Sequence, residues 1–498
     1  MIAFMLSALL SLQEQAPRAT DAEFLRRITL DLTGKIPTAD QARAFFADKD
    51  PGKREKLVDR LLASPDYARR LEQAVTVMFL ERHSGGKIPD AQWSDYLKKA
   101  FETNVPWDQI VRAMIASDGR ADDTRPAMKL LADGAGGEPN RMTRDISRLF
   151  LGRDLLCAQC HDHPSVKDYK QAEYMGLFAY LNVSKLQDDP KTKKAMLVEI
   201  VASGKTEFAT VFSPAKKYQT GPRLLGSEEL EVPKFEKGKE FEKPGVPKFR
   251  PRELLADALV RHPQFARNSV NRFWFIFQGR GIIHPLDLDH KANPPSDPAL
   301  LDALTAGFVE SGFDVRRLVR KIVTGEAYGR GGRAAPTKPL SAEQMAWSLL
   351  TATGSLEKVQ KAPSGKFSAK GYLAGKSTEP PTGLNDVLRL FVDVFGNAAG
   401  EPEVGFQPSM THALFLMNDR LVLNWLQPFE GGLVSRLSKS SGDAVAEELY
   451  LSILTRMPDA AERKEVAAHL ERNGKRREAA LGELAWALIA STEFRMNH

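Results

Sequence analysis

Apolar residues recur at three- and four-residue spacing along most of this chain, a pattern that predicts amphipathic helices. The clearest example follows a cap at Thr20 or Asp21 and ends at Gly34. The apolar face of this helix consists of Phe24, Leu25, Ile28 and Leu32. Further helices are predicted over residues 53–63, 93–101, 107–115 and 143–150.

Residues 184–249 break the helical pattern. Residues 195–202 and 206–212 are rich in apolar and β-branched side chains, and Gly204 between them supplies the backbone freedom of a turn. We therefore expect these two runs to pair as a β-hairpin. The residues that follow carry many Pro, Lys and Glu side chains, which is typical of an exposed linker.

Helical periodicity resumes at Pro251, a residue type favoured at the first position of a helix. Ser296 or Asp297 can cap one further helix, and Asp314 can cap the next. The final helices are expected over residues 449–457 and 478–494. Between these parts, residues 331–383 are rich in Gly, Pro, Ser and Lys, and we expect an irregular insertion there.

These patterns predict a mainly α protein. Two helical domains, residues 20–183 and 250–498, would be joined by the small β-containing, Pro/Lys/Glu-rich segment 184–249. The length of 498 residues agrees with more than one domain, because single hydrophobic cores stop growing at smaller sizes.

Charge narrows the class of partner. The chain has 70 basic and 64 acidic residues, a formal net charge of +6, and both signs are spread along its whole length. Nucleic-acid-binding proteins concentrate their basic residues in a patch or stripe. The sequence therefore predicts no nucleic-acid partner.

The beginning of the chain carries the features of an export signal. Residues 2–10 form an apolar run that is too short to span a bilayer and resembles the core of a signal peptide. We therefore expect residues 1–19 to act as a signal peptide, and the mature chain to have no transmembrane span. No Lys or Arg precedes the run, so an N-terminal core helix is the alternative.

The strongest chemical signal is the run Cys157-Ala158-Gln159-Cys160-His161, which holds the only two cysteines of the chain. This is the spacing by which a c-type haem is attached. Each thiol can add to one haem vinyl group, and the adjacent imidazole can bind the iron as the proximal ligand. The motif predicts a covalent haem c held by Cys157, Cys160 and His161.

Other interpretations of the two cysteines stay open. Thiols at this spacing can form a redox-active pair, although that motif belongs near a βαβ pattern, which is not visible here. A structural zinc site needs four ligands, and the sequence lacks a second pair of Cys or His at the matching spacing. A simple disulfide, or two reduced and buried thiols, would need no cofactor.

The sixth ligand of the iron has three candidates in the sequence, because imidazole and thioether are the common distal groups. They are Met410, His412 and Met417. Both methionines also fit a packing role, since Met commonly fills gaps in a core. His163 follows His161 too closely to reach the opposite face of a haem, and we expect it to orient the proximal side or to make a backbone hydrogen bond. An open or water-bound iron is the remaining alternative.

A second polar group of residues could bind a divalent metal. It comprises His284, Asp287, Asp289 and His290, whose imidazoles and carboxylates are suitable ligands. A solvated interdomain loop explains the same residues equally well. The sequence contains no Gly-x-Ser-x-Gly elbow and no His-Glu-x-x-His helix, so it offers no recognised catalytic set.

Several blocks of the chain resemble a known family. Residues 24–34 (FLRRITLDLTG), 56–65 (KLVDRLLASP) and 157–164 (CAQCHDHP) resemble the cytochrome-like domain of large planctomycete-type secreted proteins. Residues 271–274 (NRFW), 279–281 (GRG), 297–301 (DPALL) and 483–488 (ELAWAL) resemble the partner domain of unknown function that follows it. We expect the chain to depart from longer relatives in having no separate N-terminal cytochrome module.

The resemblance implies an exported bacterial protein, often encoded beside a secreted sulfatase-like protein. Together with the motif, it predicts a haem-c-binding electron-transfer or redox protein outside the cytoplasm, with a redox or secreted protein as partner. The alternative is a secreted binding or scaffold protein without haem, acting with polysaccharide or sulfatase machinery. A hydrolase with a site between the two helical domains is a third option, for which no catalytic residues can be named.

Overall fold

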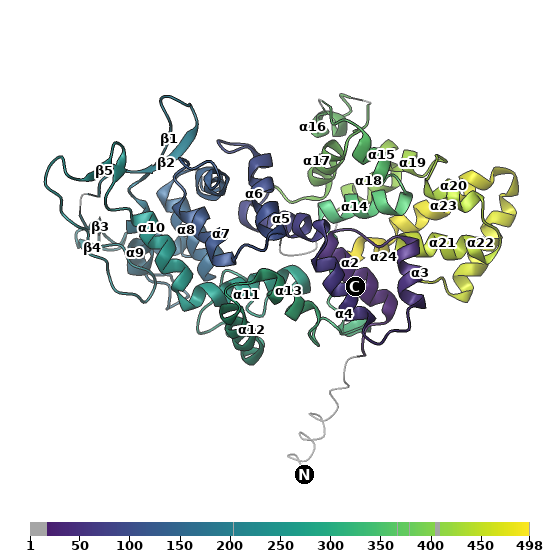
Figure 1. Ribbon diagram of the computed structural model, residues 1–498, viewed down its shortest axis with the longest axis horizontal. Coiled ribbons are helices and arrows are strands. Elements are labelled where there is room, and N and C mark those ends of the chain that lie inside the picture. Colours follow the sequence, from purple (N-terminus) through teal and green to yellow (C-terminus); the bar gives the residue numbers. More distant parts are fainter. Residues whose placement is uncertain (1–16, 203, 366, 378, 404–408, 498) are drawn as a thin grey trace, which may run out of the picture. The chain divides into compact units, whose positions relative to one another are not determined.

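The computed structural model describes residues 17–202, 204–365, 367–377, 379–403 and 409–497. Helices dominate these ranges, and the short strands within them form only two-stranded antiparallel sheets (Figure 1). The prediction of a mainly α protein is confirmed. The apolar run at residues 2–10 lies outside the described residues. Among the helices that are described, none has the length and apolar character needed to cross a membrane.

The chain folds into two compact units that are not continuous in sequence. Unit 1 contains Met1–Arg70, Ile322–Ala398 and Glu403–His498, whereas unit 2 contains Leu71–Lys321 and Ala399–Pro402. Unit 1 therefore draws on both of the predicted helical segments, because its first helices pack with the C-terminal part of the chain. The chain passes from one unit to the other within α5 (Pro65–Leu80) and α13 (Val315–Val323), and again on either side of the short stretch Ala399–Pro402.

Helix α2 (Asp21–Thr33) of unit 1 begins and ends where the sequence predicts. The Thr20 hydroxyl accepts a hydrogen bond from the Glu23 N–H, and the Glu23 carboxylate accepts one from the Thr20 N–H. This capping box satisfies two N–H groups that lack partners within the helix. Gly34 ends the helix with φ of 75°, a conformation that favours glycine. Every residue of α2 from Phe24 onward is buried.

The buried residues of α2 include two arginines. Arg26 donates hydrogen bonds to the carbonyl oxygens of Ile453 (3.1 Å) and Phe494 (2.8 Å). Arg27 donates to the carbonyl oxygen of Tyr328 (2.6 Å). Because a buried backbone carbonyl needs a partner, these guanidinium groups hold three segments that are distant in sequence against α2.

Asp31 is the third charged residue buried on α2, with 2% of its surface exposed. Its carboxylate pairs with the Lys338 ammonium (2.6 Å) and accepts hydrogen bonds from the Tyr328 hydroxyl (2.7 Å) and the Asn497 amide (2.8 Å). One carboxylate therefore joins α2 to three later segments of the same unit.

The remaining helices of unit 1 include three in the segment predicted to be irregular, residues 331–383. That prediction is wrong, because the Ser341 hydroxyl and the Gln344 side chain form a capping box at the start of a twelve-residue helix, α14. The helices are α3 (Ala39–Ala47), α4 (Lys53–Leu62), α14 (Ala342–Thr353), α15 (Leu356–Lys361), α16 (Ala369–Leu373), α17 (Leu384–Phe395), α18 (Met410–Asn418), α19 (Arg420–Trp425), α20 (Leu433–Ser438), α21 (Asp443–Leu454), α22 (Ala460–Arg472), α23 (Arg477–Ala490) and α24 (Thr492–Arg495). Strand β7 (Lys338–Pro339) pairs with β8 (Met496–Asn497).

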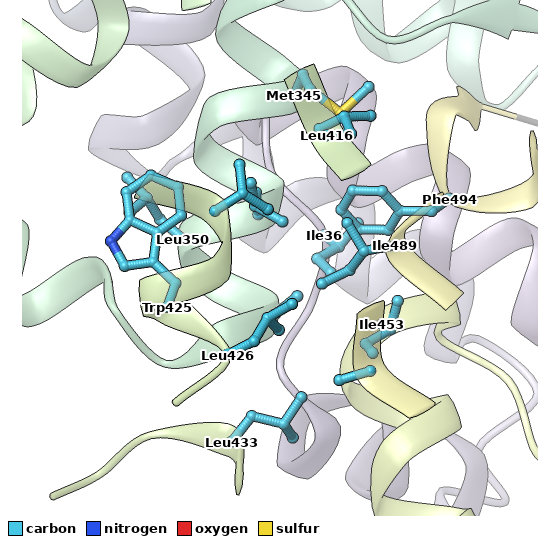
Figure 2. Packing of buried hydrophobic residues seen from close by; sticks show 14 of the residues in the cluster. Ile36, Met345, Leu350, Leu416, Trp425, Leu426, Leu433, Ile453, Ile489 and Phe494 are labelled. Atoms are coloured by element: carbon cyan, nitrogen blue, oxygen red, sulfur yellow. The ribbon is translucent and has the colours of Figure 1, made fainter. Parts of the chain in front are cut away.

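These helices enclose one apolar cluster, part of which is shown in Figure 2. Helix α14 contributes Met345 and Leu350, and the C-terminal helices contribute Trp425, Ile489 and Phe494. Each fully buried side chain of this size stabilises the fold by about 1.5–3 kcal/mol. The cluster explains why the short helices of this unit are stable despite their length.

Unit 2 holds the cysteine motif. Its helices are α6 (Asp90–Glu102), α7 (Trp107–Ala116), α8 (Pro139–Leu151), α9 (Gln171–Leu181), α10 (Pro251–Arg261), α11 (Pro263–Gln278) and α12 (Pro298–Glu310). Its sheets pair β1 (Ser184–Asp188) with β2 (Ala195–Glu199), β3 (Thr206–Phe208) with β4 (Tyr218–Thr220), and β5 (Phe241–Lys243) with β6 (Val246–Pro247). Helix α8 packs against both α9 and α11 (Figure 1).

The predicted hairpin of residues 195–202 with 206–212 is wrong. Strand β2 pairs instead with β1, which precedes it. The connecting turn is closed by Asp189, whose carboxylate accepts hydrogen bonds from the N–H groups of Lys191 (2.9 Å) and Thr192 (2.7 Å). Aspartate stabilises turns in this way, so this turn, and not Gly204, sets the pairing.

In unit 2, Asn271 on α11 holds the loop that follows the helix. Its side-chain amide donates to the Ile283 carbonyl (2.8 Å) and accepts from the Ile283 N–H (2.9 Å). Gly281 lies under this contact, where an added Cβ would overlap the Ile283 carbonyl oxygen and lie 2.8 Å from Leu286 Cδ2. The loop therefore has room only for glycine at this position.

We expect Asp31→Asn to lower the free energy of unfolding by about 3 kcal/mol, because it removes the buried carboxylate that pairs with the partly buried Lys338. Urea unfolding measures the change. The control is Asp40→Asn in α3, since the Asp40 side chain is 94% exposed and its pairing with Arg43 lies at the surface. The control should change the free energy by less than about 0.5 kcal/mol, and equal losses in both variants would contradict the role of Asp31.

Gly281→Ala should destabilise the protein by about 1–3 kcal/mol, because the loop backbone must move to admit the methyl group. The matched control is Gly307→Ala in α12, where nothing lies within 4 Å of an added Cβ. Alanine has the higher helix propensity, so this control should be neutral or stabilising by up to about 1 kcal/mol. Thermal unfolding compares the two, and a stable Gly281→Ala variant would refute the tight packing of the loop.

Candidate functional site

The cysteine motif begins on a short 3-10 helix, Leu156–Gln159, which starts four residues after Gly152, the C-cap of α8, and has Cys160 as its own C-cap. Asp154 fixes the start of this turn, because its carboxylate accepts a hydrogen bond from the Leu156 N–H (3.0 Å). The Arg144 guanidinium donates to the same carboxylate (2.8 Å). Although burial disfavours the charge, the bonds from Arg144 and Leu156 lower the pKa of Asp154. The start of the turn is therefore fixed by the charged carboxylate of Asp154.

The end of the turn is held by the first residue of α9. The Gln171 side chain donates hydrogen bonds to the Gln159 carbonyl (3.3 Å) and to the Ala209 carbonyl (3.1 Å). The Asp162 carboxylate accepts from the Gln171 N–H (2.9 Å). This backbone bond and the Lys170 ammonium lower the pKa of Asp162. Both ends of the motif are thus positioned by hydrogen bonds to neighbouring segments.

Cys157 and Cys160 are both exposed and are not joined to each other. Cys157 lies on the 3-10 helix and Cys160 is its C-cap, so the two thiols are separated by about one turn of this helix. Ala158 between them is fully buried and faces the protein. The alternative of two buried thiols is therefore wrong.

His161 follows the second cysteine and is partly exposed. Its Nδ1 lies 2.6 Å from the Asp162 carbonyl oxygen. Because a carbonyl oxygen only accepts hydrogen bonds, Nδ1 must carry the proton. In a neutral imidazole this leaves the lone pair on Nε2, which is the arrangement in which a histidine binds a metal while its other nitrogen donates to a carbonyl.

The sequence did not identify two residues that contact the motif. The Val211 N–H donates to the Cys160 carbonyl (3.1 Å), and the Phe212 ring lies 5.1 Å from the His161 ring. Phe212 is 77% exposed and Val211 57% exposed, and Leu156 on the turn itself is also exposed. The available signal was an apolar pair inside a polar loop, but its contact with the motif depends on the tertiary fold.

His163 has a structural role near the motif. Its Nδ1 accepts hydrogen bonds from the N–H groups of Ser165 (3.1 Å) and Val166 (3.0 Å), and its ring contacts the Tyr169 ring edge-on. The expectation that His163 makes backbone hydrogen bonds is confirmed.

The three candidates for the sixth ligand belong to unit 1, on α18, whereas the motif belongs to unit 2. Met410 is 79% exposed and Met417 is 39% exposed, so the packing role expected of them is wrong. Phe415 and Leu416 are the buried residues of this helix. The His412 ring contacts Phe395, and burial lowers the pKa of His412.

The second polar group of residues is used to build the loop after α11. Asp287 forms an ion pair with the buried Arg272, and Arg148 lies 3.8 Å from its other carboxylate oxygen. Asp289 accepts a hydrogen bond from Gln264, and the Nδ1 of His290 accepts one from the Ala292 N–H (3.2 Å). Asp287, Asp289 and His290 therefore each have a partner within the fold.

His284, the fourth member of this group, is partly buried, and burial lowers its pKa. A search of the described residues finds no group of three or more His, Cys, Asp or Glu side chains that could hold a metal ion. The structure therefore does not assemble His284, Asp287, Asp289 and His290 into a ligand set.

Comparison with known proteins identifies two regions. Residues 4–185 match the family model described as "PSCyt2: Protein of unknown function (DUF1549)", and residues 251–470 match "PSD1: Protein of unknown function (DUF1553)". No curated protein and no solved structure matches the chain. The chain therefore carries these two domains of unknown function in succession, DUF1549 before DUF1553.

Proposed function

We propose that this protein carries one haem c, bound covalently through Cys157 and Cys160 with His161 as the proximal ligand, and transfers electrons outside the cytoplasm. The proposal depends on one observation. Two exposed thiols that are not joined to each other lie three residues apart on one short turn, and the next residue is an imidazole whose Nδ1 donates to a carbonyl. Haem attachment requires accessible thiols, and iron ligation requires a free imidazole lone pair.

The surroundings of the thiols fit a large apolar group. Leu156, Val211 and Phe212 are exposed beside the motif, and such exposed apolar clusters mark binding surfaces. A haem bound there would supply one-electron reduction and oxidation of its iron. The protein would contribute the two sulfur attachments and His161 as the iron ligand. It would also contribute apolar side chains beside the haem, among them Phe212, whose ring contacts the His161 imidazole.

The position of the motif on the surface favours electron transfer over a buried reaction. Both thiols reach solvent, so one edge of an attached haem would face a partner protein. Attachment of haem c normally takes place outside the cytoplasm, which agrees with the expected export of the chain. We infer that the partner is another redox protein of the same compartment.

The first test is expression with an export signal in a host that attaches haem c. We expect an intact mass increased by one haem, a haem-stained band after denaturing electrophoresis, and a Soret absorbance. Replacing both thiols, Cys157→Ser with Cys160→Ser, should abolish all three, because the chain has no other cysteine. A colourless wild-type protein of unmodified mass, or one lacking only two hydrogens, would refute the proposal and favour a binding protein without haem.

The second test addresses the proximal ligand. We expect His161→Ala to move the Soret band and to change the reduction potential of the attached haem, because the axial ligand is a main control on both. Added imidazole should restore the wild-type spectrum. The control is His469→Ala, at a histidine of α22 that pairs with Glu483. Unchanged spectra in His161→Ala would assign the proximal ligand to another residue.

A further inference from the structure

A second candidate site in unit 2 is a pocket of about 540 Å³ that none of the motif residues lines. Its walls come from the end of α8, the start of α11 and the loop that follows α11. We call it the Arg153 pocket. Its charged and titratable lining residues are Arg153, Asp168, Glu173, His262, Arg267, Asp289, His290 and Lys291.

Arg153 has no partner of opposite charge in the pocket. Across the described part of the chain, its guanidinium makes no hydrogen bond and no ion pair, and its Nε is buried without a partner. The guanidinium lies 6.0 Å from the centre of the Tyr169 ring. Burying part of a cation costs free energy when its N–H groups have no hydrogen-bond partner. An anion bound beside Arg153 would supply that partner.

His290 supplies a second donor beside the same ring. Its Nδ1 accepts a hydrogen bond from the Ala292 N–H (3.2 Å), so the proton of the neutral ring is on Nε2. Within the described ranges, this Nε2–H has no acceptor. The His290 ring lies 5.9 Å from the Tyr169 ring, and Tyr169 is fully buried. The two donors without partners, the Arg153 guanidinium and the His290 Nε2–H, therefore belong to side chains that both lie beside the buried Tyr169 ring.

His262 does not compete for the same anion. Its Nε2 lies 3.0 Å from the Leu225 carbonyl oxygen, and its Nδ1 accepts from the Gln264 N–H (3.2 Å). Both ring nitrogens therefore have partners in the neutral form. Burial lowers the pKa of His262, which keeps the ring neutral.

Three acidic residues line the pocket: Asp289 accepts a hydrogen bond from the Gln264 side chain, and Asp168 and Glu173 retain free acceptor capacity. The Asp168 carboxylate accepts from the Lys291 N–H (3.1 Å), and the Glu173 carboxylate accepts from the Gly226 N–H (3.2 Å). Each carboxylate has about four lone-pair sites, so each can accept further donors from a ligand. The pocket thus offers both free donors and free acceptors, which a simple inorganic anion would not use fully.

We propose that the Arg153 pocket binds a small molecule that carries one oxyanion group beside hydroxyl or ammonium donors. The oxyanion accepts hydrogen bonds from the Arg153 guanidinium and the His290 Nε2–H. The neighbouring hydroxyl or ammonium groups donate to Asp168 and Glu173. This site is separate from the thiols, and the proposal stands whether or not the chain carries haem.

The test is isothermal titration of the full chain with four probes: glucuronate as a hydroxylated carboxylate, glycine as a zwitterion, inorganic phosphate as a bare oxyanion, and glucose as a neutral polyol. We expect glucuronate or glycine to bind more tightly than phosphate and glucose, and the tighter of the two assigns the donors as hydroxyl or ammonium. Binding to the Cys157→Ser, Cys160→Ser variant should equal that of the wild type, which separates this site from the proposed haem.

Arg153→Gln should weaken the tightest probe about tenfold or more, because it removes a charged hydrogen-bond donor. The matched control is Arg261→Gln, at an exposed arginine that does not line the pocket, and it should bind like the wild type. Lys291→Gln, at an exposed position that cannot upset the core, should weaken binding a few-fold. Absence of binding by glucuronate and glycine, equal binding of glucose, or an unchanged affinity in both Arg153→Gln and Lys291→Gln would overturn the proposal.

Discussion

The position of the cysteine motif depends on one buried ion-pair network in unit 2. Arg272 on α11 and Arg148 on α8 both face the Asp287 carboxylate, and Arg272 also donates to the Arg148 carbonyl. The Asp287 carbonyl in turn accepts the Asp154 N–H (2.8 Å), and Asp154 starts the motif turn. Because breaking one partner of such a network leaves an unpaired buried charge, the network fixes two helices and the turn together.

Buried charged side chains also join segments that are distant in sequence in unit 1. Asp31 and the guanidinium groups of Arg26 and Arg27 satisfy buried polar groups from three later segments of the chain. An apolar helix could bury the same area, but it would leave those carbonyl oxygens without partners, and each would cost about 1–3 kcal/mol. The charged residues of α2 therefore specify which segments meet, in addition to the stability that the apolar cluster provides.

The sequence predicted those parts of the fold that depend on local signals. Helix α2 has its cap at Thr20 and its stop at Gly34, both read from neighbouring residues. Strand β1 escaped detection because its residues, Ser184–Asp188, are mostly polar, and only the pairing with the buried β2 makes it a strand. Helix α14 was missed although Ser341 and Gln344 carry a capping signal, because glycines and prolines surround it.

The same distinction applies to the candidate site. The motif residues 157–161 were visible as a local spacing, whereas Val211 and Phe212 reach them only through the tertiary fold. Arg153 carried no sequence signal either, since its lack of a partner is a property of the folded chain. The local spacing of residues can thus indicate which reactive groups a chain carries, whereas the residues that surround these groups become known only from the fold.

The burial of the residues in the family-like blocks separates structural roles from functional ones. Arg26, Arg27 and Asp31 in one block, and Asn271 and Arg272 in another, are buried and bonded to backbone or to partner charges, so the fold alone accounts for them.

Cys157 and Cys160 differ from all of these residues. Cysteine is among the residue types most often buried, yet both thiols are exposed and unpaired on a turn braced at each end. Neither packing nor hydrogen bonding of the fold requires sulfur at these positions. Their exposure, their spacing and the neighbouring imidazole are what the proposed covalent attachment of haem would use.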